Sequence, residues 1–249
     1  SPRSPPAEID LLLLWSALLL LAGGLVMVYS ASMATAEAAR FTGQQPAYFL
    51  VRHGVFICVG LLAGACLFQL PLSIWQKAAP WLFLIGVLML VIVLIPGIGR
   101  EVNGARRWLP LGIVNLQPSE LMKLFAVMYA ADYTVRKMPV MHDLKQAFLP
   151  LAAAMVLVGG LLLREPDFGA FVVITAVVVG ILFLGGMRAR LFATLFFVLL
   201  VAFALLIYFS PYRRDRIFGF MDPWADAFGR GYQLSHSLIA FGRGEWFGV

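Results

Sequence analysis

The side chains best suited to chemistry lie in a polar, glycine-rich segment that runs from Pro211 to Val249. Its charged residues are Arg213, Arg214, Asp215, Arg216, Asp222, Asp226, Arg230, Arg243 and Glu245. A solvated connector is the alternative, but a connector does not need the glycines Gly229 and Gly231 or the tryptophans Trp224 and Trp246. Because ordered loops on a rigid scaffold often carry functional sites, we predict that the chemistry of this protein resides in this segment.

A second polar segment, from Gly97 to Glu120, contains the adjacent arginines Arg106 and Arg107 beside Trp108. Guanidinium groups bind phosphate oxygens through paired hydrogen bonds. The two arginines therefore suit a phosphate or pyrophosphate ligand, and anchoring at a membrane surface is the alternative.

Two ionisable residues follow at the start of an apolar run. Pro118 fits the first turn of a helix, and Glu120 fits the positive end of that helix. A charged side chain inside a membrane is costly, so we expect Lys123 to face the interior of the bundle and to serve a function. Snorkelling of Lys123 to the interface is the alternative.

The elements that must position these residues are membrane helices. The chain is 61% hydrophobic and 13% charged, with a mean hydropathy of +0.89, which excludes a soluble domain. Because backbone groups in lipid must be paired internally, we predict one all-α polytopic domain with seven spans over residues 9–209. The spans are Ile9–Tyr29, Val55–Leu70, Pro80–Pro96, Leu116–Tyr133, Phe148–Leu163, Phe168–Met187 and Leu191–Phe209.

Alternation of these spans predicts the sides of the membrane on which the connecting segments lie. Residues 1–8 form a cytoplasmic leader, and residues 210–249 form a large extracytoplasmic loop. The loop lysines lie on the predicted inside, whereas arginines occur on both sides. Basic residues are normally enriched on the inside of the membrane. Arginines on the outside therefore suggest binding of an anionic lipid head group. The outer turn with Arg164, Glu165 and Asp167 is either a self-satisfied ionic turn or a ligand site.

Familiar nucleotide and zinc signatures are missing from the sequence. It contains no GxxxxGK[ST], HExxH or clustered His/Cys pattern, and its three histidines stand apart. We therefore expect partners in the membrane, no nucleic-acid partner, no nucleotide-driven chemistry and no dedicated zinc site.

Five motifs in order carry a resemblance to a known family. They are SASM (30–33), GARRW (104–108), QPSELMKL (117–124), EPDFGA (165–170) and DPWADAFGRGYQLSHSLIAFGRGE (222–245). Nearly the whole chain resembles the SEDS family of peptidoglycan polymerases, and SASM and the last motif resemble its cell-division branch more than its elongation branch. Ala227 stands where the family usually has proline, which bears on the rigidity of that segment.

The resemblance implies a bundle of about ten spans, so we expect this chain to be part of a longer protein. It implies an enzyme of the bacterial inner membrane that polymerises lipid II at the division septum, with a class B penicillin-binding protein and other division membrane proteins as partners. A lipid II transporter and a division scaffold are the alternatives. A transporter needs charged lining at both faces, and a scaffold has no use for a buried lysine.

The resemblance also assigns roles to residues. The essential aspartate of the family falls on Asp226, and its intramembrane lysine falls on Lys123. Inverting transfer from a lipid pyrophosphate needs one base for the acceptor hydroxyl and cations for the leaving group. Asp226 would be the base, and Asp222 would brace the turn. The candidates for substrate binding are Lys123, Arg106, Arg107, Glu120, Arg213, Arg214 and Arg230, with or without a divalent cation such as Mg or Mn.

Overall fold

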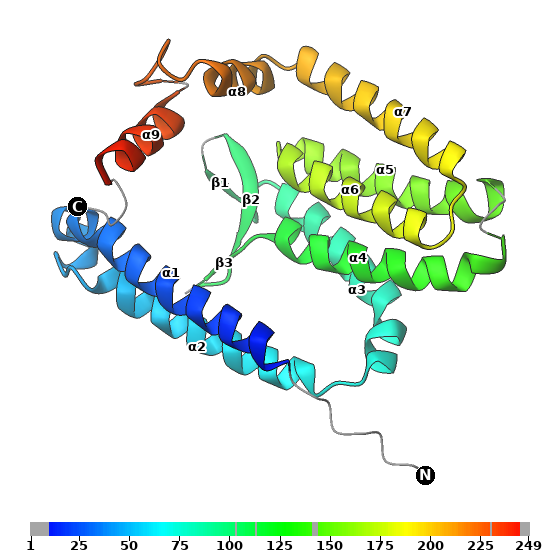
Figure 1. Cartoon of the computed structure of the whole chain (residues 1–249), viewed down its shortest axis with the longest axis horizontal. Helices are drawn as coiled ribbons and strands as arrows, with labels where there is room; N and C mark the ends of the chain where they lie inside the picture. Colours follow the sequence, from blue (N-terminus) through cyan, green and yellow to red (C-terminus); the bar gives the residue numbers. More distant parts are fainter. Residues whose placement is uncertain (1–9, 103, 113, 141–143, 230, 245–249) are drawn as a thin grey trace. The chain divides into compact units, whose positions relative to one another are not determined.

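The computed structural model describes residues 10–102, 104–112, 114–140, 144–229 and 231–244, and it is predominantly helical (Figure 1). The chain divides into two compact units, Ser1–Lys77 and Ala78–Val249, and each is described by itself. Each of the seven predicted apolar runs lies largely within a helix, which confirms the predicted helical class.

The first unit is a helical hairpin. It consists of α1 (Leu11–Ala38), the short 3-10 helix η1 (Arg40–Thr42) and α2 (Tyr48–Phe68). Asp10 caps α1, because its Oδ1 accepts hydrogen bonds from the amides of Leu12 and Leu13. α1 packs against α2, yet Leu12 and Leu20 remain 78% exposed. Apolar surface of this extent is typical of contact with lipid.

The second unit is a helical bundle with a small sheet. The helix α3 (Leu72–Leu94) contains the boundary between the units and precedes α4 (Pro118–Lys137). The turns η2 (Met138–Val140, 3-10) and η3 (Leu144–Phe148, π) lead into α5. The apolar helices that follow are α5 (Leu149–Arg164), α6 (Phe168–Leu184) and α7 (Ala189–Tyr208).

The core of this unit lies where α4 packs against α6. Gly86 allows α3 to approach α4 closely, because a Cβ at this position would lie 2.6 Å from Sδ of Met122. The buried cluster includes Phe83, Leu90, Met122, Ala126, Ala130, Leu151, Val158, Leu162, Ile174, Val178 and Leu182. This packing fixes the N-terminal ends of α4 and α6, from which several candidate residues project.

The helices differ in length and hydropathy, the two properties that allow a helix to cross a membrane. Among the described residues, α1, α2, α3 and α7 are both long and apolar enough, whereas α5 and α6 are shorter apolar helices of 16 and 17 residues. The helix α4 is less apolar than these helices, because it carries charged residues at both ends. The number of seven spans therefore stays a prediction.

A three-stranded antiparallel sheet between α3 and α4 was not predicted. It has the order β1 (Arg100–Val102), β2 (Ala105–Pro110) and β3 (Asn115–Leu116). Val102 pairs with Ala105, so two residues connect β1 to β2, and Gly104 has a positive φ of 76°. Asn-Gly is a strong hairpin signal in a sequence, and it occurs here at positions 103–104.

The segment that we predicted as a large loop contains two helices. They are α8 (Pro211–Met221) and α9 (Tyr232–Gly244), and the described residues between them, 222–229 and 231, are not helical. Pro211 favours the start of α8, because its fixed φ and missing N–H suit the first helical turn. The expectation of a non-helical conformation around Pro223 is confirmed for the part of the turn that the structure describes.

Candidate functional site

A polar cleft of about 660 Å³ in the second unit gathers three arginines. Arg107 projects from β2, and Arg213 and Arg216 project from α8. The remaining walls come from the turn between α5 and α6 and from the C-terminal end of α7. They are formed by Gly104, Ala105, Leu163, Pro166, Asp167, Phe168, Gly169, Ile207, Ser210, Tyr212 and Ile217. We call this feature the arginine cleft.

Arg107 braces the turn between α5 and α6. Its Nε donates to the carbonyl oxygen of Glu165 at 2.9 Å, and its Nη2 donates to the carbonyl oxygen of Pro166. These contacts join β2 to a turn more than fifty residues away in the sequence. We predicted that Arg107 binds pyrophosphate, but two of its nitrogens already donate to the backbone of a turn that lines the cleft.

Arg213 and Arg216 are held by aromatic rings. Arg213 donates from Nη1 to the carbonyl oxygen of Leu206 at 2.8 Å, and its guanidinium lies 5.0 Å from the centre of the Phe168 ring. Arg216 lies 5.1 Å from the ring centre of Tyr212. Both arrangements are cation–π contacts, which orient a guanidinium while its edge stays available for hydrogen bonds.

The other predicted arginines lie elsewhere. Arg106 forms an ion pair with Glu101 at 3.1 Å on the exposed hairpin. Arg214 is exposed on α8 and does not line the arginine cleft. Arg230 lies outside the described residues. Arg216, which was not among our named substrate-binding candidates, lines the cleft, whereas the candidate Arg214 does not.

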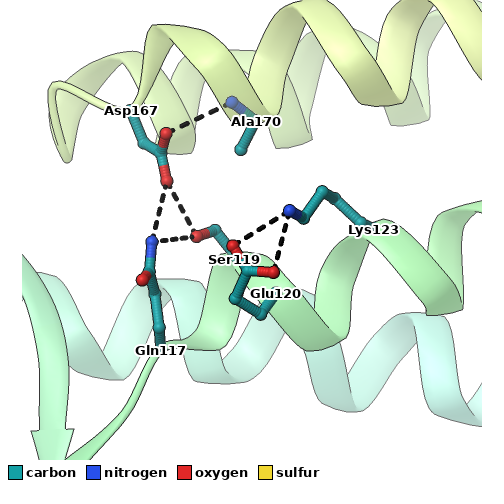
Figure 2. A network of polar contacts seen from close by, with 6 residues as sticks. All are labelled: Gln117, Ser119, Glu120, Lys123, Asp167 and Ala170. Atoms are coloured by element: carbon teal, nitrogen blue, oxygen red, sulfur yellow. Dashed lines mark hydrogen bonds and ion pairs between the residues drawn. The ribbon is translucent and has the colours of Figure 1, made fainter. Parts of the chain in front are cut away.

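A buried hydrogen-bond network joins the N-terminal ends of α4 and α6 (Figure 2). Ser119 is fully buried and donates to Oδ2 of Asp167 at 2.8 Å, and Nε2 of Gln117 donates to the same oxygen at 3.3 Å. Oδ1 of Asp167 accepts from the amide of Ala170 at 3.2 Å and so caps α6. Neutral groups thus satisfy Asp167, so the turn is not the self-satisfied ionic turn that we considered.

Lys123 pairs with Glu120 beside this network (Figure 2). The Nζ atom lies 2.8 Å from Oε2 of Glu120, and the two side chains are 33% and 59% exposed. Lys123 therefore lies at the edge of the packed core rather than deep in its interior. The reason is its place between the buried Met122 and the exposed Leu124, within two turns of the start of α4.

Glu165 is a site residue that sequence reasoning did not select. It is fully buried in the turn between α5 and α6, and neither carboxylate oxygen has a hydrogen-bond partner among the residues that the structure describes. Burial, and then the neighbouring Asp167 carboxylate, raise the pKa of Glu165 to about 8, although Arg107 opposes the shift. At neutral pH this carboxyl is mostly neutral and contributes little negative charge below the arginine cleft.

Asp226 lies in a tightly held turn at the other end of α8. Its carbonyl oxygen accepts from the amides of Gly229 at 3.2 Å and Gly231 at 3.0 Å. Gly231 is needed for this geometry, because a Cβ there would lie 2.2 Å from the carbonyl oxygen of Pro223, whereas a Cβ at Gly229 would lie 2.4 Å from Oδ2 of Asp226 and would displace that side chain.

Two further hydrogen bonds stabilise the same turn. Oδ1 of Asp222 accepts from the amide of Ala225 at 3.2 Å, which confirms the predicted bracing role of Asp222. The buried hydroxyl of Ser235 donates to the carbonyl oxygen of Ala227 at 3.1 Å and ties α9 to the turn. The rigidity that alanine at position 227 placed in doubt is thus supplied by other contacts.

Asp226 lines a cavity separate from the arginine cleft. This cavity has a volume of about 420 Å³, and its other lining residues are Phe218, Gly219, Met221, Asp222 and Ala225. The cleft and the cavity flank successive turns of α8. From Arg216 to Asp222 the helix rises about 9 Å, at about 1.5 Å per residue. A ligand that binds in the cleft therefore needs to extend along α8 to reach the carboxylate of Asp226.

The described residues contain no group of three or more His, Cys, Asp or Glu side chains placed to hold a metal ion. A divalent cation at this site would depend chiefly on oxygens of the ligand. The residues that the structure describes thus do not fit a metal centre built by the protein alone.

Comparisons with known proteins agree with this architecture. The FtsW/RodA/SpoVE family, described as cell cycle proteins, matches residues 10–249. A protein of Aromatoleum aromaticum named "Probable peptidoglycan glycosyltransferase FtsW" is 68% identical over 248 residues, which are 100% of this chain and 60% of the relative. The protein of the same name from Burkholderia thailandensis is 52% identical over 99% of this chain and 54% of its own length.

Solved structures support the same assignment. A chain from "Structural coordination of polymerization and crosslinking by a peptidoglycan synthase complex" matches with a TM-score of 0.64 and 33% identity, covering 90% of this chain and 66% of that chain. The rod shape determining protein RodA of Thermus thermophilus matches with a TM-score of 0.54 and 31% identity, covering 72% and 58%.

The chain spans about 60% of the length of the curated relatives that it matches. The family match extends over nearly all of the chain, and four of its helices have the length and composition of membrane spans. This chain is therefore part of a multi-pass membrane protein and belongs to the FtsW/RodA/SpoVE family.

Proposed function

We propose that the complete protein is a peptidoglycan glycosyltransferase that polymerises lipid II into glycan strands during cell division. The names of the curated relatives support the activity and the division role. The observation that carries the proposal is the structure of α8, which has arginines in a cleft at one end and Asp226 in a glycine-held turn at the other. This arrangement separates a place for an anionic leaving group from a place for a base.

In the proposed reaction, Asp226 accepts the proton of the acceptor sugar hydroxyl as its oxygen attacks the anomeric carbon of the donor. The bond between that carbon and the pyrophosphate oxygen breaks on the opposite side, so the configuration inverts. The arginine cleft stabilises the negative charge that develops on undecaprenyl pyrophosphate. The amides of Gly229 and Gly231 donate to the carbonyl oxygen of Asp226 and so fix its backbone.

Lys123 and Glu120 have a different place in this proposal. They form a partly exposed ion pair beside the buried Ser119–Asp167 network. An ion pair at this position could bind polar groups of the sugar–peptide part of lipid II without carrying the proton transfer. A divalent cation would accompany the pyrophosphate, and no step of the proposed reaction runs through it.

The proposed partners are a class B penicillin-binding protein and other division membrane proteins. One of the matching structures is described as a peptidoglycan synthase complex, which supports a partner of this kind. We propose that the complex lies in the bacterial inner membrane at the division septum. In that orientation residues 210–249 lie on the extracytoplasmic side, where lipid II is consumed.

Polymerisation by the complete protein in detergent tests this function against transport and scaffolding. The purified protein and its penicillin-binding partner are incubated with labelled lipid II, with crosslinking blocked, and the glycan chains are separated by length. We expect glycan strands to form with the complex and to be absent without the complete protein. A transporter or a scaffold would leave lipid II unchanged, because no membrane separates two compartments in detergent.

A further inference from the structure

Among the described residues, the arginines of the cleft differ from Arg106, Lys123 and Arg136 in forming no ion pair with a carboxylate. Arg106, Lys123 and Arg136 form ion pairs with Glu101, Glu120 and Asp132. Among the described residues, no carboxylate oxygen lies within 4.0 Å of the side-chain nitrogens of Arg107, Arg213 or Arg216. Three like charges that share one cleft repel each other, so their proximity indicates that an anion offsets them.

The acids of the turn between α5 and α6, Asp167 and Glu165, do not offset all three charges. Asp167 lines the cleft, but both of its oxygens accept hydrogen bonds from Gln117, Ser119 and Ala170 (Figure 2). Glu165 is buried in the turn, and its carboxylate oxygens have no hydrogen-bond partner within the described part of the chain. Asp167 carries one negative charge against three guanidinium groups, so net positive charge remains in the cleft for a ligand.

The three arginines differ in how many donors remain for that ligand. Arg107 donates from Nε and Nη2 to backbone carbonyl oxygens, and Arg213 donates from Nη1 to the carbonyl oxygen of Leu206. Arg216 contacts the ring of Tyr212 and makes no hydrogen bond within the described residues, so all of its five donors remain. Arg213 and Arg216 are three residues apart on α8 and so lie on the same face.

The walls of the cleft indicate that the anion has an apolar tail. Leu163, Phe168, Ile207 and Ile217 line the same space as the guanidinium groups. Ile207 lies at the end of α7, a helix with the length and composition of a membrane span. A ligand that joins a multiply charged head group to a long hydrocarbon chain matches both parts of this lining.

We propose that the arginine cleft binds the diphosphate of a polyprenyl diphosphate, with Arg216 as the principal ligand and Arg213 and Arg107 as pre-oriented supports. The proposal rests on the proposed function and makes it more specific, because it moves the main contact from the Arg106–Arg107 pair to α8. A diphosphate carries more oxygens than one guanidinium can contact, which suits two arginines spaced by one helical turn.

Binding of undecaprenyl diphosphate to the complete protein in lipid nanodiscs tests the proposal without any turnover. Arg216→Ala should weaken binding by about 10- to 100-fold, the range for loss of a charged hydrogen-bond pair. Arg216→Lys should recover part of the affinity, because it restores the charge without the fork. Arg190→Ala removes the same charge from an exposed position outside the cleft and should leave the affinity within about twofold.

Two further arms decide between this site and its alternatives. Arg214→Ala removes a neighbouring charge of α8 that does not line the cleft, and a loss equal to that of Arg216→Ala would overturn the proposal in favour of general attraction. Inorganic pyrophosphate should compete at least about tenfold more weakly than the lipid, because it cannot use the apolar walls. Equal competition would assign the site to free diphosphate and overturn the lipid part.

The outcome is separable from that of the proposed function. A protein that binds undecaprenyl diphosphate through Arg216 but makes no glycan strands would refute the polymerase activity and leave this site standing. A protein that makes strands, while Arg216→Ala binds the lipid normally, would refute the site alone. Matching thermal unfolding of wild type and variants shows that each result concerns binding and not folding.

Discussion

The arginine cleft and the Asp226 turn lie at opposite ends of α8 and are built in different ways. The cleft is assembled from β2, the turn between α5 and α6, the end of α7 and α8, so its residues come from distant parts of the sequence. The Asp226 turn is closed by contacts among residues 222–235. The comparison shows that binding of an anion depends here on tertiary packing, whereas the position of the base depends on local backbone geometry.

The largest expected effect is at the proposed base. Asp226→Asn keeps the shape of the side chain but cannot accept the proton, so lipid II polymerisation should fall by about 10²- to 10⁴-fold. Asp222→Asn is the matched control, because an asparagine oxygen can still accept from the amide of Ala225. Activities of the two variants are compared at equal membrane levels, and equal losses would remove the assignment of Asp226 as base.

The next effect concerns the geometry of the turn. Gly231→Ala places a methyl group against the carbonyl oxygen of Pro223 and should displace the backbone around Asp226. A displacement of about 1 Å can reduce a catalysed rate by about 10²-fold. Gly244→Ala, at the end of α9 with open space around it, is the control. Polymerisation by Gly231→Ala at the wild-type rate would show that the turn need not be rigid.

The sequence predicts the locally built Asp226 turn better than the arginine cleft, whose residues come from distant parts of the chain. The apolar runs predicted the helices, and the Asp-Pro pair predicted the bracing of the turn by Asp222. The arginine cleft could not be predicted, because its members are brought together by packing of α3–α6 and by the fold of the hairpin. Arg216 was missed since we expected a loop from 211 onward; helical spacing would have placed it beside Arg213.

Other misses have different physical reasons. The Asn-Gly pair at 103–104 indicated a hairpin, but the short strands around it do not alternate in polarity strongly enough to stand out. The burial of Glu165 has no sequence signal, because a charged residue in a turn between helices is usually exposed. Lys123 was expected deeper in the core, and its place near the start of α4, between the buried Met122 and the exposed Leu124, accounts for the difference.

A smaller effect is expected at the brace of the cleft. Arg107→Lys keeps the charge but cannot donate to the oxygens of Glu165 and Pro166 in the same geometry. We expect a loss of about 1 to 3 kcal/mol in stability, because a part-buried and an exposed carbonyl group lose a charged donor. The thermal midpoint of the variant should fall, and Arg106→Lys, on the exposed pair with Glu101, should change it much less. An unchanged midpoint for Arg107→Lys would contradict the bracing role.

The last effect is a pH dependence of stability. The ordinary pKa of 4.5 applies to Glu165 in the unfolded chain, and burial raises the pKa to about 8 in the folded protein. Between these values the unfolded chain releases a proton that the folded protein keeps. The contribution of Glu165 to stability therefore falls as pH rises through this window, by at most about 1.4 kcal/mol per pH unit.

Glu165→Gln removes this titration. Thermal midpoints measured from pH 5 to pH 8 should fall less steeply for the variant than for wild type, and the variant should be the more stable protein at pH 8. Parallel curves for the two proteins would show that Glu165 is ionised in the folded state or is not buried.

The most direct test of the division of labour along α8 measures binding and polymerisation on the same two variants of the complete protein. We predict that Asp226→Asn binds undecaprenyl diphosphate like wild type while its polymerisation is lost, and that Arg216→Ala loses affinity for this lipid. If Asp226→Asn loses lipid binding in parallel with polymerisation, or polymerises lipid II at the wild-type rate, the separation of base and anion site at the two ends of α8 is contradicted.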